Sequence, residues 1–232
     1  MTEGLKYNLH MLKAKSKTWQ SKRLTTAAKQ GFKYVIGIDE AGRGPLAGPI
    51  SFCAFKVELD TLLKLAKRKD FIPAHHDSKK LTEKTREVWY QEILKLVKQD
   101  NKSFSYCVAM PKNTEIDKFG LSLVIKKALA KVLRGVKADE KNCLVLLDGG
   151  LRIDKRFTQE TIVKGDENEL VIAMASIMAK VTRDHHMIKC AKLYPDYCFD
   201  VHKGYGTKKH LLAIKRCGLC PIHRKSFLKR FV

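Results

Sequence analysis

Residues 33–57 read KYVIGIDEAGRGPLAGPISFCAFKV, which is two apolar runs separated by a turn rich in glycine and proline. The run from Lys33 to Asp39 has the length and composition of a buried strand. The glycines and prolines of residues 42–49 break the chain sharply after it. Residues 50–57 predict a second strand, close enough in sequence to pair with the first as an antiparallel neighbour. We therefore expect a sheet that begins with these two strands.

The rest of the chain predicts helices that alternate with strands. Thr82 can cap a helix that has Glu83 in its first turn, and Thr114 can cap the next helix. Residues 167–193 predict one long helix whose first half is apolar nearly all round, as is typical of a buried helix. Further strands are expected at residues 103–109, 143–147 and 161–164. This order favours an α/β fold, with a mixed β-sheet flanked by helices.

The chain is expected to divide into three parts. Residues 1–32 predict a basic N-terminal arm, residues 33–200 the sheet domain, and residues 201–232 a small basic helical C-terminal segment. The last part is rich in Lys and Arg and contains neither Asp nor Glu. A helix over residues 207–217 would end at Gly218, a favourable residue just after a helix.

The charge of the chain indicates a polyanionic partner. Its 232 residues include 46 Lys and Arg against 24 Asp and Glu, a formal net charge of +22. Such a field attracts nucleic acid and, as a weaker alternative, an anionic membrane surface. No apolar run approaches the ~20 residues of a membrane span. The seven cysteines form no regular framework and no signal-peptide core is present, so we expect a reduced, cytoplasmic setting.

Four acidic residues stand at the ends of apolar runs or at the start of a helix. Asp39 and Glu40 precede the glycine-rich turn, Asp148 precedes two glycines, and Asp166 precedes the long helix. Ligand sites of α/β sheets are built at such positions. A buried carboxylate is costly unless a cation neutralises it, and oxygen ligands suit Mg²⁺ or Mn²⁺. Taken one by one, these acids are equally compatible with turns and helix caps.

The adjacency of Asp39 and Glu40 constrains this metal hypothesis. In a regular strand, neighbouring side chains point to opposite faces of the sheet. Both carboxylates can therefore meet one pair of metal ions only if the strand ends between them and the backbone turns. The Ala41–Gly42 dipeptide permits such a turn. We therefore expect the first strand to end at Asp39.

The stretch from Gly37 to Pro49 resembles the signature of the ribonuclease HII family. Arg43 in the Gly-Arg-Gly run favours this family over the related ribonuclease HIII, which lacks the run. The resemblance extends over roughly residues 33–228, nearly the whole chain. Further blocks agree in the same order: Asp77–Leu81, Leu147–Gly149, Lys164–Asp166 leading to Ala175–Asp184, and His202–Thr207.

The resemblance implies a ribonuclease-H-like fold and a role for each matching residue. It implies two divalent ions, Mn²⁺ or Mg²⁺, that activate water and stabilise the leaving 3′-oxygen. Gly42, Arg43 and Gly44 would sense a ribose 2′-hydroxyl, and Tyr205 would contact the sugar on the DNA side of a junction. The metal-binding acids would be Asp39, Glu40, Asp148 and Asp166.

The implied substrates are RNA/DNA hybrids and duplex DNA that contains single ribonucleotides. Lys79 and Lys203 are expected to contact phosphates, and the enzyme to act as a monomer. Two other classes are weighed against this hypothesis. Proofreading exonucleases usually carry Asp-x-Glu, which places both acids on one strand face, whereas this chain has adjacent acids. A basic RNA-binding protein without activity has no need for four acids at the ends of buried elements.

Overall fold

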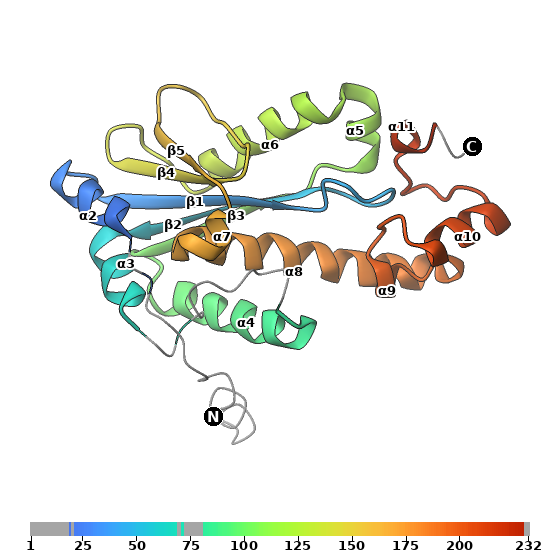
Figure 1. The fold of residues 1–232 in the computed structure, drawn as a ribbon, viewed down its shortest axis with the longest axis horizontal. Helices are drawn as coiled ribbons and strands as arrows, with labels where there is room; N and C mark the ends of the chain where they lie inside the picture. Colours follow the sequence, from blue (N-terminus) through green and yellow to red (C-terminus); the bar gives the residue numbers. More distant parts are fainter. Residues whose placement is uncertain (1–18, 20, 69–70, 72–80, 230–232) are drawn as a thin grey trace, which may run out of the picture.

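The computed structural model describes residues 19, 21–68, 71 and 81–229. Five strands form one mixed sheet in the order β3-β2-β1-β4-β5, and helices cover both faces (Figure 1). The strands are β1 (Tyr34–Ala41), β2 (Ser51–Glu58), β3 (Phe104–Ala109), β4 (Cys143–Asp148) and β5 (Thr158–Ile162). The helices are α2 (Lys22–Lys29), α3 (Leu59–Ala66), α4 (Glu83–Gln99), α5 (Asn113–Phe119), α6 (Leu121–Gly135), α7 (Gly165–Asn168), α8 (Leu170–Leu193), α9 (Phe199–His202), α10 (Lys208–Cys217) and α11 (Lys225–Leu228).

Strand β1 lies at the centre of the sheet and has a partner on each edge. It pairs with β2 in antiparallel register over its whole length, from Tyr34 with Glu58 to Ala41 with Ser51. On its other edge it runs parallel to β4, and this pairing ends at Ile38 with Leu147. The α/β fold with a mixed sheet is thus confirmed. The expected strand at residues 161–164 is shifted, because β5 ends at Ile162.

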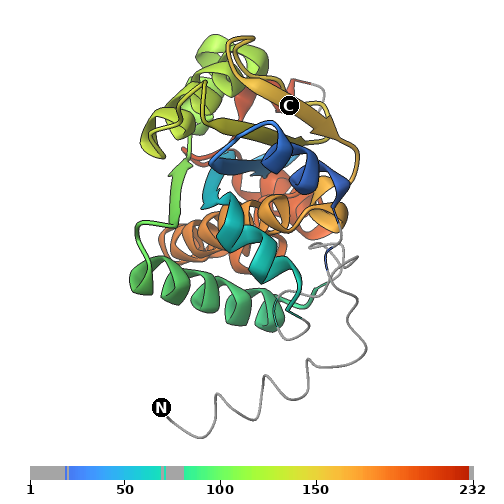
Figure 2. The ribbon, with the colours of Figure 1, turned by 90° about the vertical axis from the view of Figure 1, so that its left-hand side faces the viewer.

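Helix α8 packs directly against β1, on one face of the sheet. Gly37 makes this close approach possible: a Cβ atom there would lie 2.3 Å from the carbonyl oxygen of Val171. Side chains alternate along the strand, so Val35 belongs to the apolar cluster on the α8 face and Ile36 and Ile38 to the cluster on the other face. Figure 2 shows the sheet between α6 on one side and α8 with α4 on the other.

The helix boundaries confirm some expectations and correct others. Thr82 caps α4, and its hydroxyl accepts a hydrogen bond from the backbone N–H of Thr85. Thr114 is not a cap: α5 begins one residue earlier, and the Glu115 side chain accepts the backbone N–H of Lys112. The single helix expected over residues 167–193 is two helices, α7 and α8, because the backbone of Glu169 is extended (φ −130°, ψ 118°).

The two ends of the described chain pack against the domain. Trp19 and the apolar face of α2 are buried in the cluster that also contains α8. Residues 1–18 and 20 of the expected N-terminal arm lie outside the described residues. Near the C-terminus, α10 ends before Gly218 as expected, but it begins at Lys208, with Thr207 as its cap. This segment shares a small apolar cluster with the end of α8. In the part of the chain that the structure describes, we find no helix that could cross a membrane.

Candidate active site

Asp39 and Asp148 lie on neighbouring parallel strands, at their carboxyl ends. The register pairs Ile38 with Leu147, and the next residue of each strand is an aspartate. The apolar neighbours of Asp148 divide between the two faces as those of β1 do, with Leu146 on the α8 face and Leu147 on the other. Both aspartates therefore belong to the α8 face of the sheet.

The Asp39 carboxylate is almost fully buried, with 5% of the residue exposed. Burial raises the pKa of Asp39 well above its usual value, and the negative charges of Asp148 and Glu40 raise it further. A hydrogen bond from the hydroxyl of Ser176, on α8, acts against this rise. The backbone N–H of Glu40 also donates to Oδ1 of Asp39, at 2.6 Å. The site is thus a buried negative group with an unfavourable charge and few compensating donors.

Strand β1 does not end between Asp39 and Glu40, so that expectation is wrong. The pairing with β2 continues through Glu40 with Phe52 and Ala41 with Ser51, because only the β4 side of the ladder stops at Ile38. Pleating then directs Glu40 to the face opposite Asp39. The two carboxylates still influence each other, and Glu40 also lies 3.7 Å from the guanidinium of Arg43.

Asp166 reaches this edge of the sheet from α7. The preceding residue, Gly165, donates its backbone N–H to Oδ1 of Asp148 at 2.6 Å. A Cβ atom at Gly165 would lie 2.6 Å from the side chain of Ile172, so the close packing of this turn requires glycine. Asp166 itself is buried, with 4% exposed. The turn therefore holds the fourth acid next to the end of β4.

The chemistry of these side chains fits divalent cations. All four offer carboxylate oxygens, which are the preferred ligands of Mg²⁺ and Mn²⁺. The negative charges of Asp148 and Glu40 act unfavourably on Asp39, and a bound cation would neutralise this excess of negative charge. Within the described residues, no three Asp, Glu, His or Cys side chains already form a closed metal-binding cluster. The acids thus lie at one edge of the sheet, but their carboxylates do not converge on a common metal position.

The Gly-Arg-Gly turn presents one tightly packed glycine and one open glycine. Gly42 has a positive φ of 88°, and a Cβ atom there would lie 1.9 Å from Nε of Arg183. At Gly44, no heavy atom of the described chain lies within 4 Å of the corresponding position. The turn is therefore packed inward at its first glycine and open outward at its last. Arg43 is exposed between them.

Arg183, which packs against Gly42, also packs against Tyr205. The side chain of Tyr205 is 43% exposed, and the guanidinium carbon of Arg183 lies 5.8 Å from the centre of its ring. The backbone carbonyl of Tyr205 faces Nδ1 of the buried His210 at 2.9 Å. The loop that carries Tyr205 is thus supported from beneath while its ring stays accessible.

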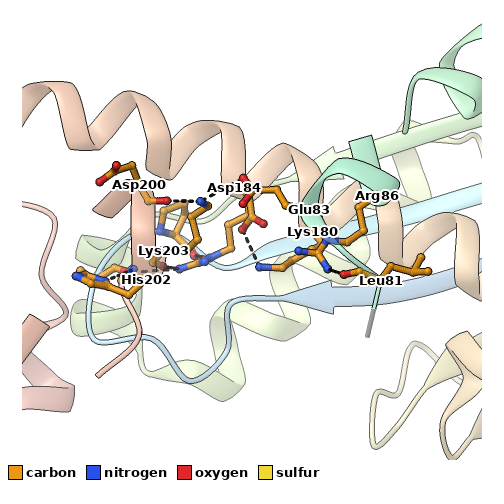
Figure 3. Close-up of polar contacts among 12 residues, drawn as sticks. Leu81, Glu83, Arg86, Lys180, Asp184, Asp200, His202 and Lys203 are labelled. Carbon is orange, nitrogen blue, oxygen red and sulfur yellow. Dashed lines mark hydrogen bonds and ion pairs between the residues drawn. The ribbon is translucent and has the colours of Figure 1, made fainter. Parts of the chain in front are cut away.

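Of the two lysines expected to contact phosphates, the structure describes only Lys203. Lys79 lies outside the described residues. Lys203 is nearly buried: its ammonium donates to the carbonyl oxygen of Asp200 and lies 3.3 Å from Glu83 (Figure 3). A phosphate contact by Lys203 would have to compete with these partners. Figure 3 also shows Lys180 pointing toward Asp184, and the two side chains form an ion pair at 2.8 Å.

Several residues around the site were not assigned roles from the sequence. Ser176, on α8, hydrogen-bonds Asp39. Its signal is its position four residues before Lys180, on one face of a helix that is otherwise apolar. Arg183 and Arg224 are both fully buried and contact the Gly-Arg-Gly turn and its continuation. Arg183 adjoins Asp184 in the sequence, but nothing in the spacing indicates that Arg224 is buried.

A mixed sheet with carboxylates at the ends of two parallel central strands, covered by helices on both faces, defines the class of ribonuclease-H-like nucleases. The solved structure of ribonuclease H2 from Pyrococcus horikoshii OT3 has the same fold, with a TM-score of 0.63 over 85% of this chain and 98% of that one, at 23% identity. Ribonuclease HIII from Bst in complex with Mn²⁺ matches with a TM-score of 0.60 over 92% and 71%, at 18% identity.

The chain belongs to the ribonuclease HII family, whose model matches residues 36–230. Ribonuclease HII of Fusobacterium nucleatum is 44% identical over 210 residues, which are 87% of this chain and 88% of the relative. That of Caldicellulosiruptor bescii is 39% identical over 203 residues, 88% and 90% of the two chains. The protein is therefore an endonuclease, a hydrolase that cleaves the RNA strand of RNA/DNA hybrids.

Proposed function

We propose that this nuclease incises duplex DNA on the 5′ side of an embedded ribonucleotide, by hydrolysis that depends on two divalent ions. The observation that carries the proposal is the juxtaposition of Asp39 with Asp148 beside the Gly-Arg-Gly turn. Two carboxylates whose negative charge is not fully compensated thus lie next to a backbone segment that a sugar edge can approach. Its products would carry 5′-phosphate and 3′-hydroxyl ends.

Asp39, Asp148 and Asp166 would hold the ions, Mn²⁺ or Mg²⁺, from the α8 side of the sheet. Glu40 leaves the opposite face of β1 and would reach an ion only around the end of the strand. When bound, two such ions supply an activated water and charge stabilisation for the leaving 3′-oxygen. The structural relative from Bst was solved in complex with Mn²⁺, which supports an oxygen-ligand site in this fold. Asp39 and Asp148 are the best placed to bind a cation, because each is held at a strand end and Asp39 is buried. Ser176 would orient Asp39 through its hydrogen bond.

The Gly-Arg-Gly turn would recognise the ribose. Within the described chain, the backbone N–H groups of Arg43 and Gly44 have no hydrogen-bond partner, and both residues are exposed. The open side of Gly44 lets a sugar approach the backbone closely. A 2′-hydroxyl can both donate and accept, so it matches such a free N–H group. Arg43 supplies positive charge for the neighbouring phosphate.

Tyr205 would test the next sugar in the 3′ direction. Its exposed ring offers a flat apolar surface for a deoxyribose, on which a 2′-hydroxyl would crowd. The combination demands a ribonucleotide on one side of the cut and favours a deoxyribonucleotide on the other. An activity of this kind removes ribonucleotides left in DNA, so we place the protein in ribonucleotide repair. It would act as a monomer.

The test compares cleavage of three labelled duplexes in Mg²⁺ or Mn²⁺. The first contains one ribonucleotide, the second an all-RNA strand and the third only DNA. We expect a single cut 5′ of the lone ribonucleotide and none in DNA. If the wild-type enzyme cuts the all-RNA strand freely but ignores the lone ribonucleotide, the junction-specific activity is wrong.

Variants of Tyr205 refine the test. Tyr205→Ala should lose most of the preference for the junction and lower the rate by about tenfold or more, because the sugar is no longer positioned. Tyr205→Phe is the matched control: it keeps the ring and should keep most of the preference. The metal concentration for half-maximal activity should be the same in both variants as in the wild type.

A further inference from the structure

We infer that Arg183 and Arg224 are positioning residues, which fix the spacing between the Gly-Arg-Gly turn and the Tyr205 loop and thereby set the preference for an RNA–DNA junction. The inference rests on the proposed function, since it concerns how the two sugar-recognising segments are held in register. Neither arginine touches the reacting atoms in this account. Both act through the backbone of the segments that do.

Arg183, on α8, bridges the two segments. Its Nε donates to the carbonyl oxygen of Pro49 at 2.9 Å. One terminal nitrogen, Nη2, donates both to the carbonyl of Ala47, at 3.3 Å, and to the carbonyl of Lys203, at 2.9 Å. A single planar group therefore contacts the continuation of the Gly-Arg-Gly turn and the loop that leads into Tyr205.

Arg224, near the C-terminus, holds the turn from another side. Its Nη2 donates to the carbonyl of Gly42 at 2.7 Å, its Nη1 to that of Arg43 at 2.9 Å, and its Nε to that of Gly48 at 2.9 Å. Its backbone N–H donates to the carbonyl of Leu46 at 2.8 Å. The segment from Gly42 to Pro49 is thus fastened by its carbonyl oxygens to two guanidinium groups.

Arg183 and Arg224 contribute to the fold through their hydrogen bonds and not through their positive charge. Both are fully buried, and among the described residues neither forms an ion pair. Burial lowers the pKa of Arg183, and burial together with the charge of Arg183 lowers the pKa of Arg224 to about 9. Burying a cation without a carboxylate is costly. The compensation is geometric, because a guanidinium offers five donors in a fixed planar fork that lysine lacks.

The Gly-Arg-Gly turn with its continuation and the Tyr205 loop also pack tightly against each other. The backbone N–H of Leu46 donates to the carbonyl of Gly204 at 2.8 Å. Gly204 has a φ of 86°, and a Cβ atom there would lie 2.5 Å from the carbonyl oxygen of Ala47. Nη1 of Arg183 is buried without a hydrogen-bond partner in the described chain, and its guanidinium lies 5.8 Å from the ring of Tyr205. The spacing of the loops is therefore set by contacts that tolerate no added atom.

This arrangement makes junction preference more sensitive than cleavage itself. A substrate with one ribonucleotide is recognised only if the ribose and the following deoxyribose meet their two segments together. In an all-RNA strand every nucleotide carries a ribose, so its cleavage depends less on the spacing between the two segments. Misplacement by about 1 Å can cost about a hundredfold in rate, so a shifted loop should lower kcat on the single-ribonucleotide duplex.

The experiment measures kcat and KM of Arg183→Lys on the single-ribonucleotide duplex and on the all-RNA hybrid. Lysine keeps the charge and removes the fork. We expect the ratio of the two kcat/KM values to fall by about tenfold or more, mainly through kcat on the single-ribonucleotide duplex. Ile93→Ala is the control, because Ile93 is buried in α4 in an apolar cluster that does not include Ala47. It should lower the melting temperature and leave the ratio unchanged.

Gly204→Ala gives a second and independent variant. It retains both arginines but inserts a methyl group against Ala47, so it should lower the same ratio even if Arg183→Lys folds poorly. A ratio within twofold of the wild type in the folded variants, or an equal loss on both substrates like that of Ile93→Ala, would overturn the inference. Absence of a junction preference in the wild type would instead overturn the proposed function.

Discussion

The backbone N–H of Gly165 donates a hydrogen bond of 2.6 Å to Oδ1 of Asp148. This one contact joins the start of α7 to the end of β4, across 17 residues of chain. Because Asp166 follows Gly165 directly, the bond sets the position of one proposed metal-binding acid relative to another. It also gives Oδ1 of Asp148 a structural role in addition to the ligand role proposed for this carboxylate.

Asp39→Asn should abolish cleavage and stabilise the metal-free protein. The substitution removes a buried charge that Asp148 and Glu40 repel. The activity should fall by at least a hundredfold, while the melting temperature should rise by about 2–4 °C for each kcal/mol of repulsion relieved. Thermal unfolding in a chelator and the single-ribonucleotide assay measure the two effects. Near-normal turnover of this variant would contradict the assignment of Asp39.

Removing the partners of Glu169 should destabilise the domain. The nearly buried Glu169 carboxylate accepts a hydrogen bond from Ser21 at 2.9 Å and pairs with Arg23 at 3.2 Å. The double variant Ser21→Ala, Arg23→Ala leaves this carboxylate without those partners, at a cost of about 1–3 kcal/mol. Urea unfolding gives the value. Lys29→Ala, at an exposed position of the same helix, is the control and should change little.

The same double variant should also weaken activation by metal. Glu169 separates α7, which carries Asp166, from α8, and its backbone N–H donates to Gly165 at 2.8 Å. Loosening Glu169 therefore loosens the Asp166 turn. We expect a higher Mn²⁺ concentration for half-maximal activity. An unchanged metal requirement in a destabilised variant would mean that the contact serves stability alone.

Replacement of Lys208 and Lys209 by Gln should reduce the salt dependence of substrate binding. Both lysines are exposed at the start of α10, a few residues after Tyr205. Each phosphate neutralised contributes about −0.9 to the slope of log affinity against log salt on duplex DNA. Binding titrations at several salt concentrations give this slope, and gels give the cut position, which should not move. An identical slope would show that these lysines face away from the duplex.

Acid should destabilise the protein through a buried group of three histidines, His202, His210 and His223. Burial lowers the pKa of all three, that of His210 to about 4, and the neighbouring imidazoles oppose its protonation. The unfolded chain binds these protons near pH 6.5, so stability is complete above that pH and is lost as the pH falls toward 4. His210 alone contributes a slope of about 1.4 kcal/mol per pH unit in this window, and His202 and His223 act in the same direction.

The variant His210→Gln should flatten this acid-side slope by about one proton. His210 contacts His223 through its Nε2 at 3.0 Å and stacks on His202 with ring centres 4.5 Å apart. Urea unfolding at several pH values between 7 and 4.5 measures the slope. His185→Gln, at a half-exposed position paired with Glu87, is the control. If both variants keep the wild-type slope, other groups govern the acid sensitivity.

The sequence predicts the sheet well because its strands are short apolar runs with clear turns. The strand starting near Lys33, its antiparallel neighbour and the run at residues 143–147 all lie within two residues of their observed bounds. The end of β1 differs most from its expected position, by two residues. Its two edges stop at different residues, Ile38 and Ala41, and a pattern along one strand cannot show which neighbour continues.

The acids of the candidate site are visible in the sequence, whereas their supports are not. Asp148 and Asp166 stand beside glycines at the ends of apolar runs, which is a local signal. Arg183 and Arg224 bind carbonyl oxygens that lie 20 to 182 residues away. Such contacts depend on the whole fold, and a buried arginine has the same sequence signal as an exposed one.

The central position of β1 has a consequence for how the chain is made. Its neighbour β2 follows after a short turn, but Cys143, the β4 partner of Tyr34, is synthesised more than a hundred residues later. At roughly 5–20 residues per second, the ribosome needs about 5–20 s to reach β4. One edge of an apolar strand stays unpaired for that time, and open edges invite pairing with other chains. The yield of active enzyme during synthesis therefore depends on the order of its strands, and a chaperone that covers nascent chains would raise it most within those seconds.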